Sequence, residues 1–570
     1  MKLFFFHCPS HLLAHFYKIS VCSLLGALYS FVFAPNPHGW IQIGILTFIF
    51  LIFFNRSSRP KNVIYLFFFF FSQFTVGLYW LFISLHSYGD MPAPLSAIAV
   101  AMFTAALSIF PVGVIHIGKR LYPNLNLSAY SFSEKILSLF IIASLWSLAD
   151  WLRGTLFTGF PWLATGYGQI DGPFQYFAPW FGVYGIGWIT AFFAACLALF
   201  CKTFLLLIVR RSRSIPAFIL TSNPNSSFNA TLEKTLSFKQ LIIHLIIILC
   251  IIYSVLSLSV LAGKKQFTQP FGQPLNLRLL QGNIDQNLKF AEYNLPQTIN
   301  LYQKLITKKA ADLIITPETA YPILFNQISN QNIKQLYDFS RATQSAILLG
   351  TFSVNENFTY NQDNELNISN SVIGFNANYP AYYRYNKIHL VPFGEYNPPG
   401  FSWLISQLNI PLNQLEPGSY KQTHFFVKQQ AAAINICYED IFGEEIAQSL
   451  RVQRNQHNRP TTFLINTTNL AWFGDTVAQE QHLQMARMRT LETQRPMARA
   501  TNTGITAAID AQGKVLARLP TFMTGELEIT IQPMSGFTPY IKWGNLPFLL
   551  TTLIVLAIAL ISNDLFRKSR

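Results

Sequence analysis

The sequence is poor in charged residues, and the shortage is uneven along the chain. Charged residues make up 12% of its 570 positions, whereas 51% are hydrophobic and 52 are phenylalanine. Soluble domains contain about 25% charged residues. Residues 1–262 and 543–570 consist of apolar runs with short polar gaps, while residues 263–542 have an ordinary globular composition. This pattern excludes a wholly soluble protein and predicts a membrane protein with one large water-exposed domain.

Cysteine is scarce in that water-exposed part. Of the six cysteines only Cys437 falls there, so it has no disulfide partner in the same domain. The chain has no CxxC pair and no Cys/His cluster with the spacing of a zinc site, and we therefore expect no metal and no other cofactor.

Excess positive charge is also missing from the water-exposed part. Residues 263–542 hold 23 Lys+Arg against 20 Asp+Glu, although the whole chain carries a net charge of +15. A near-neutral domain offers no basic face for nucleic acid, so we expect no nucleic-acid partner. The basic residues instead lie beside the apolar runs, where they indicate membrane orientation.

The apolar runs predict about eight membrane-spanning helices, because a span needs roughly 20 mostly apolar residues. The expected spans lie near residues 16–33, 40–54, 63–84, 94–117, 136–151, 177–209, 241–261 and 546–561. The gaps after the even-numbered spans are basic, as in Arg56, Arg59 and Lys61 or Lys119, Arg120 and Lys135, and should face the cytoplasm. The large domain then lies on the opposite side of the membrane. In a bacterium with two membranes, this places the chain in the inner (cytoplasmic) membrane and the large domain in the periplasm.

Residues 263–542 alternate between strand-like and helix-like runs, which predicts a layered α/β domain. Strands are expected at 275–281, 312–316, 346–351 and 431–437, and helices at 296–309, 333–343, 443–451 and 479–492. Three polar residues stand where such elements end: Glu318, Lys387 and Cys437. Active-site groups commonly occupy such positions. Taken singly, each also has an ordinary interpretation, as a helix N-terminal carboxylate, a solvated lysine and a core cysteine.

The surroundings of these residues carry a family resemblance. The motifs PETA (317–320), KIHLVPFGE (387–395) and ICYE (436–439) resemble the three signatures of the nitrilase (carbon–nitrogen hydrolase) superfamily. That resemblance implies an αββα sandwich with a Glu318–Lys387–Cys437 triad. Within the superfamily the chain resembles the apolipoprotein N-acyltransferase family, through GDMP (89–92), WLRG (151–154), TGFPW (158–162), AWFGD (471–475) and QMAR (484–487).

The resemblance implies a ping-pong acyl transfer. Cys437 would take a fatty acyl chain from a phospholipid, typically phosphatidylethanolamine, and pass it to the α-amino group of a diacylglyceryl-cysteine on a lipoprotein. A cysteine thiol has a pKa of about 8.5 in water, so a base or a nearby cation must help to expose the thiolate. Glu318 is the candidate base, and Lys387 is the cation that would favour the thiolate and stabilise the oxyanion.

Five further residues are implied as supporting or binding groups: Glu395, Tyr438, Glu439, Trp472 and Phe290. The backbone N–H of Tyr438 is a candidate second oxyanion donor. Trp472 is expected to contact acyl chains or membrane, and Phe290 stands where many family members have tryptophan. Glu395 and Glu439 could instead be structural ion-pair partners.

Some interpretations stay open at this stage. Asp150 and Arg153, near the end of a span, are expected to form a solvated interfacial pair rather than a headgroup contact. A membrane-tethered amidase or nitrilase acting on a small C–N substrate is an alternative enzyme. A transporter with an external receptor domain is a third possibility, although the spans contain few charges for such a role.

Overall fold

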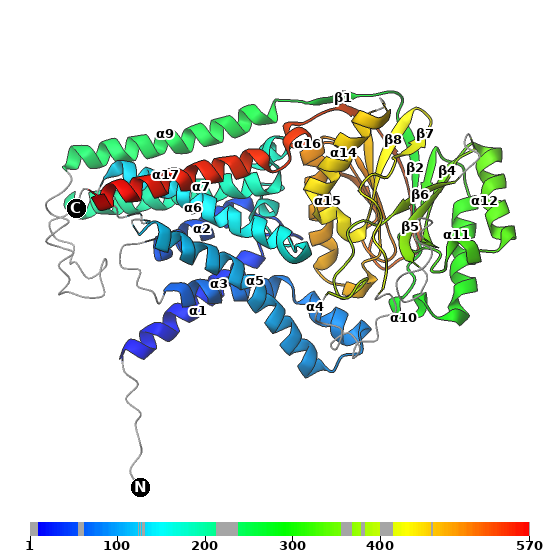
Figure 1. Cartoon of the computed structure of the whole chain (residues 1–570), viewed down its shortest axis with the longest axis horizontal. Helices are drawn as coiled ribbons and strands as arrows, with labels where there is room; N and C mark the ends of the chain where they lie inside the picture. Colours follow the sequence, from blue (N-terminus) through cyan, green and yellow to red (C-terminus); the bar gives the residue numbers. More distant parts are fainter. Residues whose placement is uncertain are drawn as a thin grey trace, which may run out of the picture.

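The computed structural model describes residues 10–54, 62–123, 125, 127, 131–211, 237–354, 367–377, 382–398, 414–457 and 460–568. A bundle of long helices forms one end of the molecule and a layered α/β domain the other (Figure 1). The bundle contains α1 (Ser10–Ser30), α2 (Gly39–Phe53), α3 (Asn62–Gly77), α4 (Trp80–Ile83), α5 (Ala93–Leu121), α6 (Phe132–Thr155), α7 (Ala178–Arg211), α9 (Phe238–Gly263) and α17 (Leu546–Lys568).

The membrane character of the bundle is confirmed, whereas the expected number of spans stays a prediction. Within the described residues, α5, α6, α7, α9 and α17 give five helices that are long and apolar enough to cross a membrane. A sixth arises if α3 and the helix that begins at Trp80, which are bent by 53° at their break, count as one span. Helix α2 is apolar but shorter.

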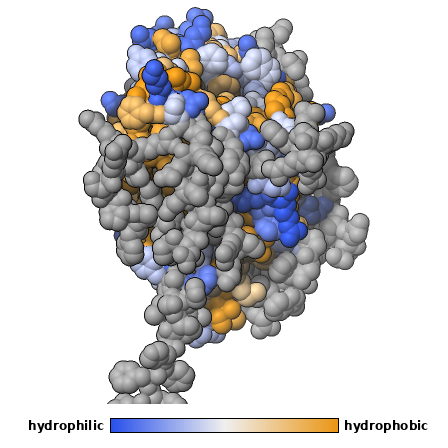
Figure 2. Space-filling view, turned by 90° about the vertical axis from the view of Figure 1, so that its left-hand side faces the viewer, coloured by the Kyte–Doolittle hydropathy of each residue, from blue (hydrophilic) through white to orange (hydrophobic). Residues whose placement is uncertain are grey.

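The helix ends that carry basic residues gather at the end of the bundle away from the α/β domain. Lys119 near the end of α5 donates to the Phe53 carbonyl at the end of α2 (2.6 Å), and Asn563 of α17 donates to the Leu121 carbonyl (3.0 Å). Figure 2 looks onto this end, where hydrophilic and hydrophobic residues both reach the surface. The expected basic loop at 55–61 lies outside the described residues.

Two six-stranded sheets form the centre of the α/β domain. One has the order β13-β2-β3-β4-β5-β6 and the other β12-β11-β10-β9-β8-β7. The first comprises β2 (Leu275–Gln281), β3 (Leu313–Ile315), β4 (Ala346–Val354), β5 (Ile368–Phe375), β6 (Tyr383–Asn386) and β13 (Gly525–Ile531). The second comprises β7 (Phe425–Val427), β8 (Gln430–Ile436), β9 (Phe463–Thr468), β10 (Met497–Thr501), β11 (Ala507–Ile509) and β12 (Val515–Arg518).

The sheets face each other across an apolar core that includes Leu279, Ile315, Ile434, Ile465 and Ala500. Helices α11 (Leu295–Thr307) and α12 (Asn330–Thr343) cover the outer face of the first sheet. Helices α14 (Gly443–His457), α15 (Ala478–Thr493) and α16 (Pro539–Trp543) cover that of the second (Figure 1). This layering confirms the expected αββα sandwich beside an α-helical membrane bundle.

The sequence predicted most of these elements within a few residues, but it missed some of the strands. Strands β10 and β13 and the small β1–β14 pair, β1 (Thr268–Pro270) and β14 (Met534–Gly536), were not predicted. Strand β13 alternates polar and apolar residues at the edge of its sheet, and β10 carries Arg499 in its middle. Strand β10 therefore lacks the continuous apolar run by which a buried strand is recognised, whereas the alternation in β13 is itself a strand signal that the prediction overlooked.

Helix α15 lies between the second sheet and the bundle and is buried along nearly its whole length. Gln481 accepts hydrogen bonds from the indole N–H groups of Trp80 (3.2 Å) and Trp162 (2.7 Å) in the bundle. Glu492 accepts one from the backbone N–H of Val183 in α7 (2.9 Å). These contacts fix the α/β domain against the bundle through buried polar groups.

The expectation that Asp150 and Arg153 form a solvated pair is wrong. Arg153 is 2% exposed, and its guanidinium donates to the carbonyls of Phe160 (2.5 Å) and Trp162 (2.8 Å) as well as to Asp150 (3.0 Å). Asp150 also accepts from the backbone N–H of Thr165 (2.8 Å). Arg153 is thus buried and Asp150 half-buried, and together they hydrogen-bond the backbone of the loop after α6, whose polar groups need partners away from water.

Replacing Arg153 with lysine should therefore destabilise the protein. A lysine ammonium cannot reproduce the planar fork that serves three acceptors, and each unpaired buried acceptor costs about 1–3 kcal/mol. We expect a lower midpoint of thermal unfolding for Arg153→Lys in detergent. Arg120→Lys, on an exposed position of α5, is the matched control, and equal midpoints for the two variants would contradict the structural role of Arg153.

Candidate active site

Glu318, Lys387 and Cys437 come together at the ends of strands from both sheets. Glu318 follows β3 and Lys387 follows β6 in the first sheet, while Cys437 follows β8 in the second. All three are buried, with 6%, 1% and 9% of their surfaces exposed. The structure thus brings the expected triad residues together although they are far apart in the sequence.

Lys387 is held by two carboxylates. Its Nζ lies 2.8 Å from Glu395 Oε2 and 3.4 Å from Glu318 Oε1. Burial by itself lowers the pKa of Lys387, but the charges of Glu395 and Glu318 outweigh burial and hold this pKa above its ordinary value. Lys387 is therefore a permanent cation at neutral pH and is not a candidate proton acceptor.

Two hydrogen bonds orient the carboxylate of Glu318. The side-chain amide of Asn370 in β5 donates to Oε1 (2.7 Å), and the backbone N–H of Asn469 donates to Oε2 (2.8 Å). The same Asn370 amide also donates to Glu395 Oε1 (3.0 Å). One amide group thereby holds two carboxylates of like charge beside a single lysine, which fixes the orientation of both.

Cys437 begins a short 3-10 turn, η8 (Cys437–Ile441), and has a positive φ of 51°. A non-glycine residue in this conformation is uncommon and recurs at functional sites, where the surroundings enforce it. Burial raises the pKa of the Cys437 thiol to about 12, and the charge of Glu318 acts in the same direction, while that of Lys387 lowers it. The expected effect of Lys387 is therefore present, but burial outweighs it, which favours the protonated thiol over the thiolate.

Glu439 connects the Cys437 turn to the segment that carries Lys387. Its carboxylate accepts from the backbone N–H groups of Ile436 (2.5 Å) and Ile388 (2.5 Å) and from the hydroxyl of Tyr385 (3.0 Å). Burial raises the pKa of Glu439 to about 7, against the lowering effect of these backbone hydrogen bonds. Glu439 thus joins the two sheets beside Lys387 and Cys437, because it accepts hydrogen bonds from backbone N–H groups and a hydroxyl that belong to both.

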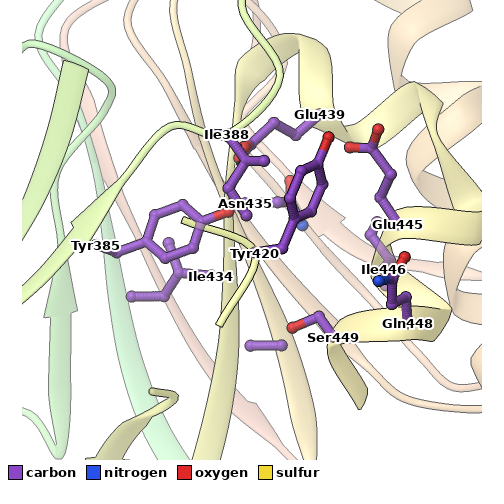
Figure 3. A pocket seen from close by; sticks show the side chains of 11 residues that line it. Tyr385, Ile388, Tyr420, Ile434, Asn435, Glu439, Glu445, Ile446, Gln448 and Ser449 are labelled. Atoms are coloured by element: carbon purple, nitrogen blue, oxygen red, sulfur yellow. Dashed lines mark hydrogen bonds between the residues drawn. The ribbon is translucent and has the colours of Figure 1, made fainter. Parts of the chain in front are cut away.

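A cavity lies beside Glu439 (Figure 3). Its lining includes Tyr385, Tyr420, Glu439 and Glu445. None of the triad residues lines it. The cavity is therefore separate from the space where Glu318, Lys387 and Cys437 meet.

Tyr438 connects the nucleophile turn to the membrane bundle. Its hydroxyl donates to the carbonyl of Gly159 (3.1 Å) in the TGFPW segment. Gly159 has a φ of 82°, and a Cβ there would lie 2.1 Å from the Gly154 carbonyl oxygen, so only glycine fits. The residue next to Cys437 is thereby fixed against the end of α6.

The two remaining aromatic candidates, Trp472 and Phe290, have different neighbours. The carbonyl of Trp472 accepts from the Ser84 hydroxyl (2.7 Å), and its ring lies edge-on to Tyr88 at 6.4 Å between centroids, both in the turn after α4. Phe290 packs against Phe352 and follows a short helix, α10 (Gln286–Lys289). Trp472 thus contacts the bundle, whereas Phe290 lies on the α/β domain.

Sequence reasoning missed three residues of this site: Asn370, Asn469 and Lys289. Lys289, immediately before Phe290, is buried and donates to the backbone carbonyl of Glu318 (3.0 Å). Asn370 lies between Ser369 and Ser371 in the polar first half of β5, so the sequence alone did not mark it as a site residue. Asn469 acts through its backbone N–H, which no side-chain pattern reveals.

Two solved structures resemble part of the chain. A mutant of the Nesterenkonia AN1 amidase from the nitrilase superfamily covers 48% of this chain and 95% of its own, at 14% identity and a TM-score of 0.31. The carbon-nitrogen hydrolase from Helicobacter pylori G27 covers 45% and 89%, at 14% identity and a TM-score of 0.32.

Sequence comparisons cover both halves. The family model for the apolipoprotein N-acyltransferase N-terminal domain matches residues 25–196, and that for carbon-nitrogen hydrolases matches residues 276–538. The apolipoprotein N-acyltransferase of Ralstonia nicotianae is 38% identical over 546 residues, covering 95% of this chain and 92% of that protein. That of Nitrosomonas europaea is 35% identical over 543 residues, covering 94% and 95%. The chain belongs to the apolipoprotein N-acyltransferase family.

Proposed function

We propose that this membrane-bound bacterial acyltransferase moves a fatty acyl chain from a phospholipid to the N-terminal amine of a diacylglyceryl-cysteine on lipoproteins. The donor class we propose is phosphatidylethanolamine, and the acyl chain passes through a thioester on Cys437. The observation that carries this proposal is the Glu318–Lys387–Cys437 cluster, joined by Tyr438 to the end of a membrane helix. A nucleophile in that position is within reach of lipid substrates.

The first half-reaction starts from a protonated thiol. Because the pKa of Cys437 is raised, proton transfer from sulfur to Glu318 must accompany attack on the ester carbonyl. Lys387 faces the developing oxyanion, and the backbone N–H of Tyr438 is the proposed second donor, worth about 3 kcal/mol in comparable sites. The tetrahedral intermediate collapses when the ester C–O bond breaks, and Glu318 returns its proton to the departing lysophospholipid alcohol.

The second half-reaction reverses the proton flow. The acceptor amine attacks the thioester carbonyl while Glu318 takes a proton from its nitrogen, and the C–S bond then breaks. That proton returns to the sulfur, so an amide and the free thiol result. Covalent transfer suits two bulky lipid substrates because they need not bind at the same time.

The supporting residues receive positioning roles in this proposal. Glu395 and Asn370 hold Lys387 and Glu318 in place, and Glu439 holds the turn that carries Cys437 and Tyr438. Trp472 is proposed to contact acyl chains at the boundary with the bundle, and Phe290 to lie beside the acyl-binding space. Residues 263–542 form the proposed catalytic domain between the membrane segments 1–262 and 543–570.

Incubation with defined phospholipid should leave one acyl group on Cys437. Intact mass of the purified enzyme should rise by that acyl group, with one lysophospholipid released per enzyme, and Cys437→Ala should gain nothing. Addition of a diacylated lipopeptide with a free α-amine should discharge the adduct, whereas the same lipopeptide with an acetylated amine should not. Absence of both adduct and lysophospholipid would overturn the proposed donor and intermediate.

Glu318→Gln should slow formation of the thioester by about 10²–10⁴-fold, the usual contribution of a general base. The amide keeps the shape of the side chain but cannot accept the thiol proton. The rate is measured by quenching the reaction and following the acyl mass over time. Glu528→Gln, at a side chain 45% exposed and paired with Lys309, is the matched control, and similar rates for both variants would contradict the assignment of Glu318 as base.

The catalytic domain should face the periplasm. In a background whose native cysteines are replaced by serine, Lys309→Cys on the α/β domain should react with a membrane-impermeant maleimide in intact spheroplasts. Arg120→Cys lies near the end of α5 that points away from the α/β domain, and it should react only after lysis. Reaction of Arg120→Cys alone in intact spheroplasts would reverse the proposed orientation.

A further inference from the structure

Lys289 is a second buried lysine at the active site. It is 2% exposed and ends the short helix α10, and its Nζ donates to the backbone carbonyl of Glu318 (3.0 Å). Lys387 pairs with two carboxylates, whereas Lys289 forms no ion pair with any residue that the structure describes. Burying an ammonium without a carboxylate partner costs desolvation free energy and so destabilises the fold. Such an arrangement indicates that the positive charge of Lys289 is needed for function.

The segment that carries Lys289 holds Glu318 from two directions. Gln286, one turn before Lys289, accepts from the side-chain amide of Asn469 (2.8 Å). The backbone N–H of that same Asn469 donates to the carboxylate of Glu318. Helix α10 therefore contacts the backbone of Glu318 directly, through Lys289, and the carboxylate of Glu318 indirectly, through Asn469. These two contacts keep Lys289 in a fixed position relative to the triad.

The charges around the nucleophile are unbalanced without Lys289. Glu318 and Glu395 carry two carboxylates and Lys387 one ammonium, so the cluster holds one uncompensated negative charge, which proton transfer from Cys437 to Glu318 moves onto the sulfur without removing it. Burial lowers the pKa of Lys289 to about 8, while negative charge at Glu318 and at Cys437 raises it. Electrostatic coupling is mutual, so a protonated Lys289 favours negative charge on the sulfur, in addition to the larger effect of Lys387.

We propose that Lys289 is a positioning residue that fixes the Glu318 turn and supplies the second positive charge which favours the Cys437 thiolate. The inference rests on the proposed function, because it assigns Lys289 a part in activating that nucleophile. The titratable groups that face this region are Asp285 on the same segment, Glu318 after β3, Cys437 after β8, and Lys387 with Glu395 beyond Glu318.

The pH dependence of the Lys289 effect has a definite sign. Lys289 is charged below its pKa of about 8 and loses this charge as the pH rises through that value. Its electrostatic stabilisation of the Cys437 thiolate is therefore complete near pH 6.5 and lost near pH 9.5. A residue that only packs the loop would change the reactivity of Cys437 by the same factor at every pH.

Alkylation of Cys437 by iodoacetamide in the full-length protein tests this sign, because it reports thiolate formation without any acyl donor. The rate is followed by mass spectrometry of the Cys437 peptide. For Lys289→Gln, which keeps a hydrogen-bond donor, we expect a loss of about tenfold at pH 6.5, equivalent to one pKa unit, and a difference within about twofold at pH 9.5. Lys289→Met should lose at least as much at pH 6.5. Lys289→Arg should retain the wild-type rate at pH 6.5.

Lys309→Met, at an exposed position of the same domain, should match the wild type throughout. A ratio of wild-type to Lys289→Gln rates that is constant between pH 6.5 and 9.5, or equal to one, would overturn the proposal. The result is distinguishable from failure of the proposed function: an acyl adduct that never forms would leave this alkylation profile unchanged.

Discussion

The burial of Lys387 is the constraint around which the active site is built. An ammonium removed from water loses several kcal/mol of hydration, and here the loss is offset by Glu395 and Glu318 at 2.8 and 3.4 Å. Both carboxylates must approach one nitrogen, so the ends of β3 and β6 are required to meet at the same edge of the sheet. Asn370, from the strand beside β6, makes this possible because its amide donates to both carboxylates at once.

Cys437, the proposed nucleophile, comes from the other sheet, and its position depends on a second buried carboxylate. Glu439 accepts hydrogen bonds from the backbone N–H groups of Ile436, just before Cys437, and of Ile388, just after Lys387. A shift of either sheet would break one set of these bonds and leave a buried acceptor unpaired. The positive φ of Cys437 is enforced by the same turn, so the location of the sulfur follows from backbone hydrogen bonding rather than from its own side chain.

The membrane bundle contributes to the site by holding its loops. Arg153 donates hydrogen bonds to backbone carbonyls in the segment that contains Gly159, and the carbonyl of Gly159 accepts a hydrogen bond from the hydroxyl of Tyr438. Ser84, after α4, fixes the backbone of Trp472. These contacts explain why the sequence motifs of the bundle lie near its ends rather than in the middle of its spans: they are the points at which the bundle meets the α/β domain.

The sequence by itself determined the two-part architecture and the order of most strands and helices, and it singled out the three residues of the proposed triad. Apolar runs, alternating elements and residues at strand ends are local signals, and each can be recognised without knowing the fold. The tertiary structure alone decided that Arg153 is buried with Asp150 half-buried beside it, that burial raises the pKa of the Cys437 thiol, and that Lys289, Asn370 and Asn469 lie beside the triad residues. These properties depend on burial and on groups brought together from distant strands, because the electrostatic state of a side chain is set by its surroundings in space and not by its neighbours in the chain.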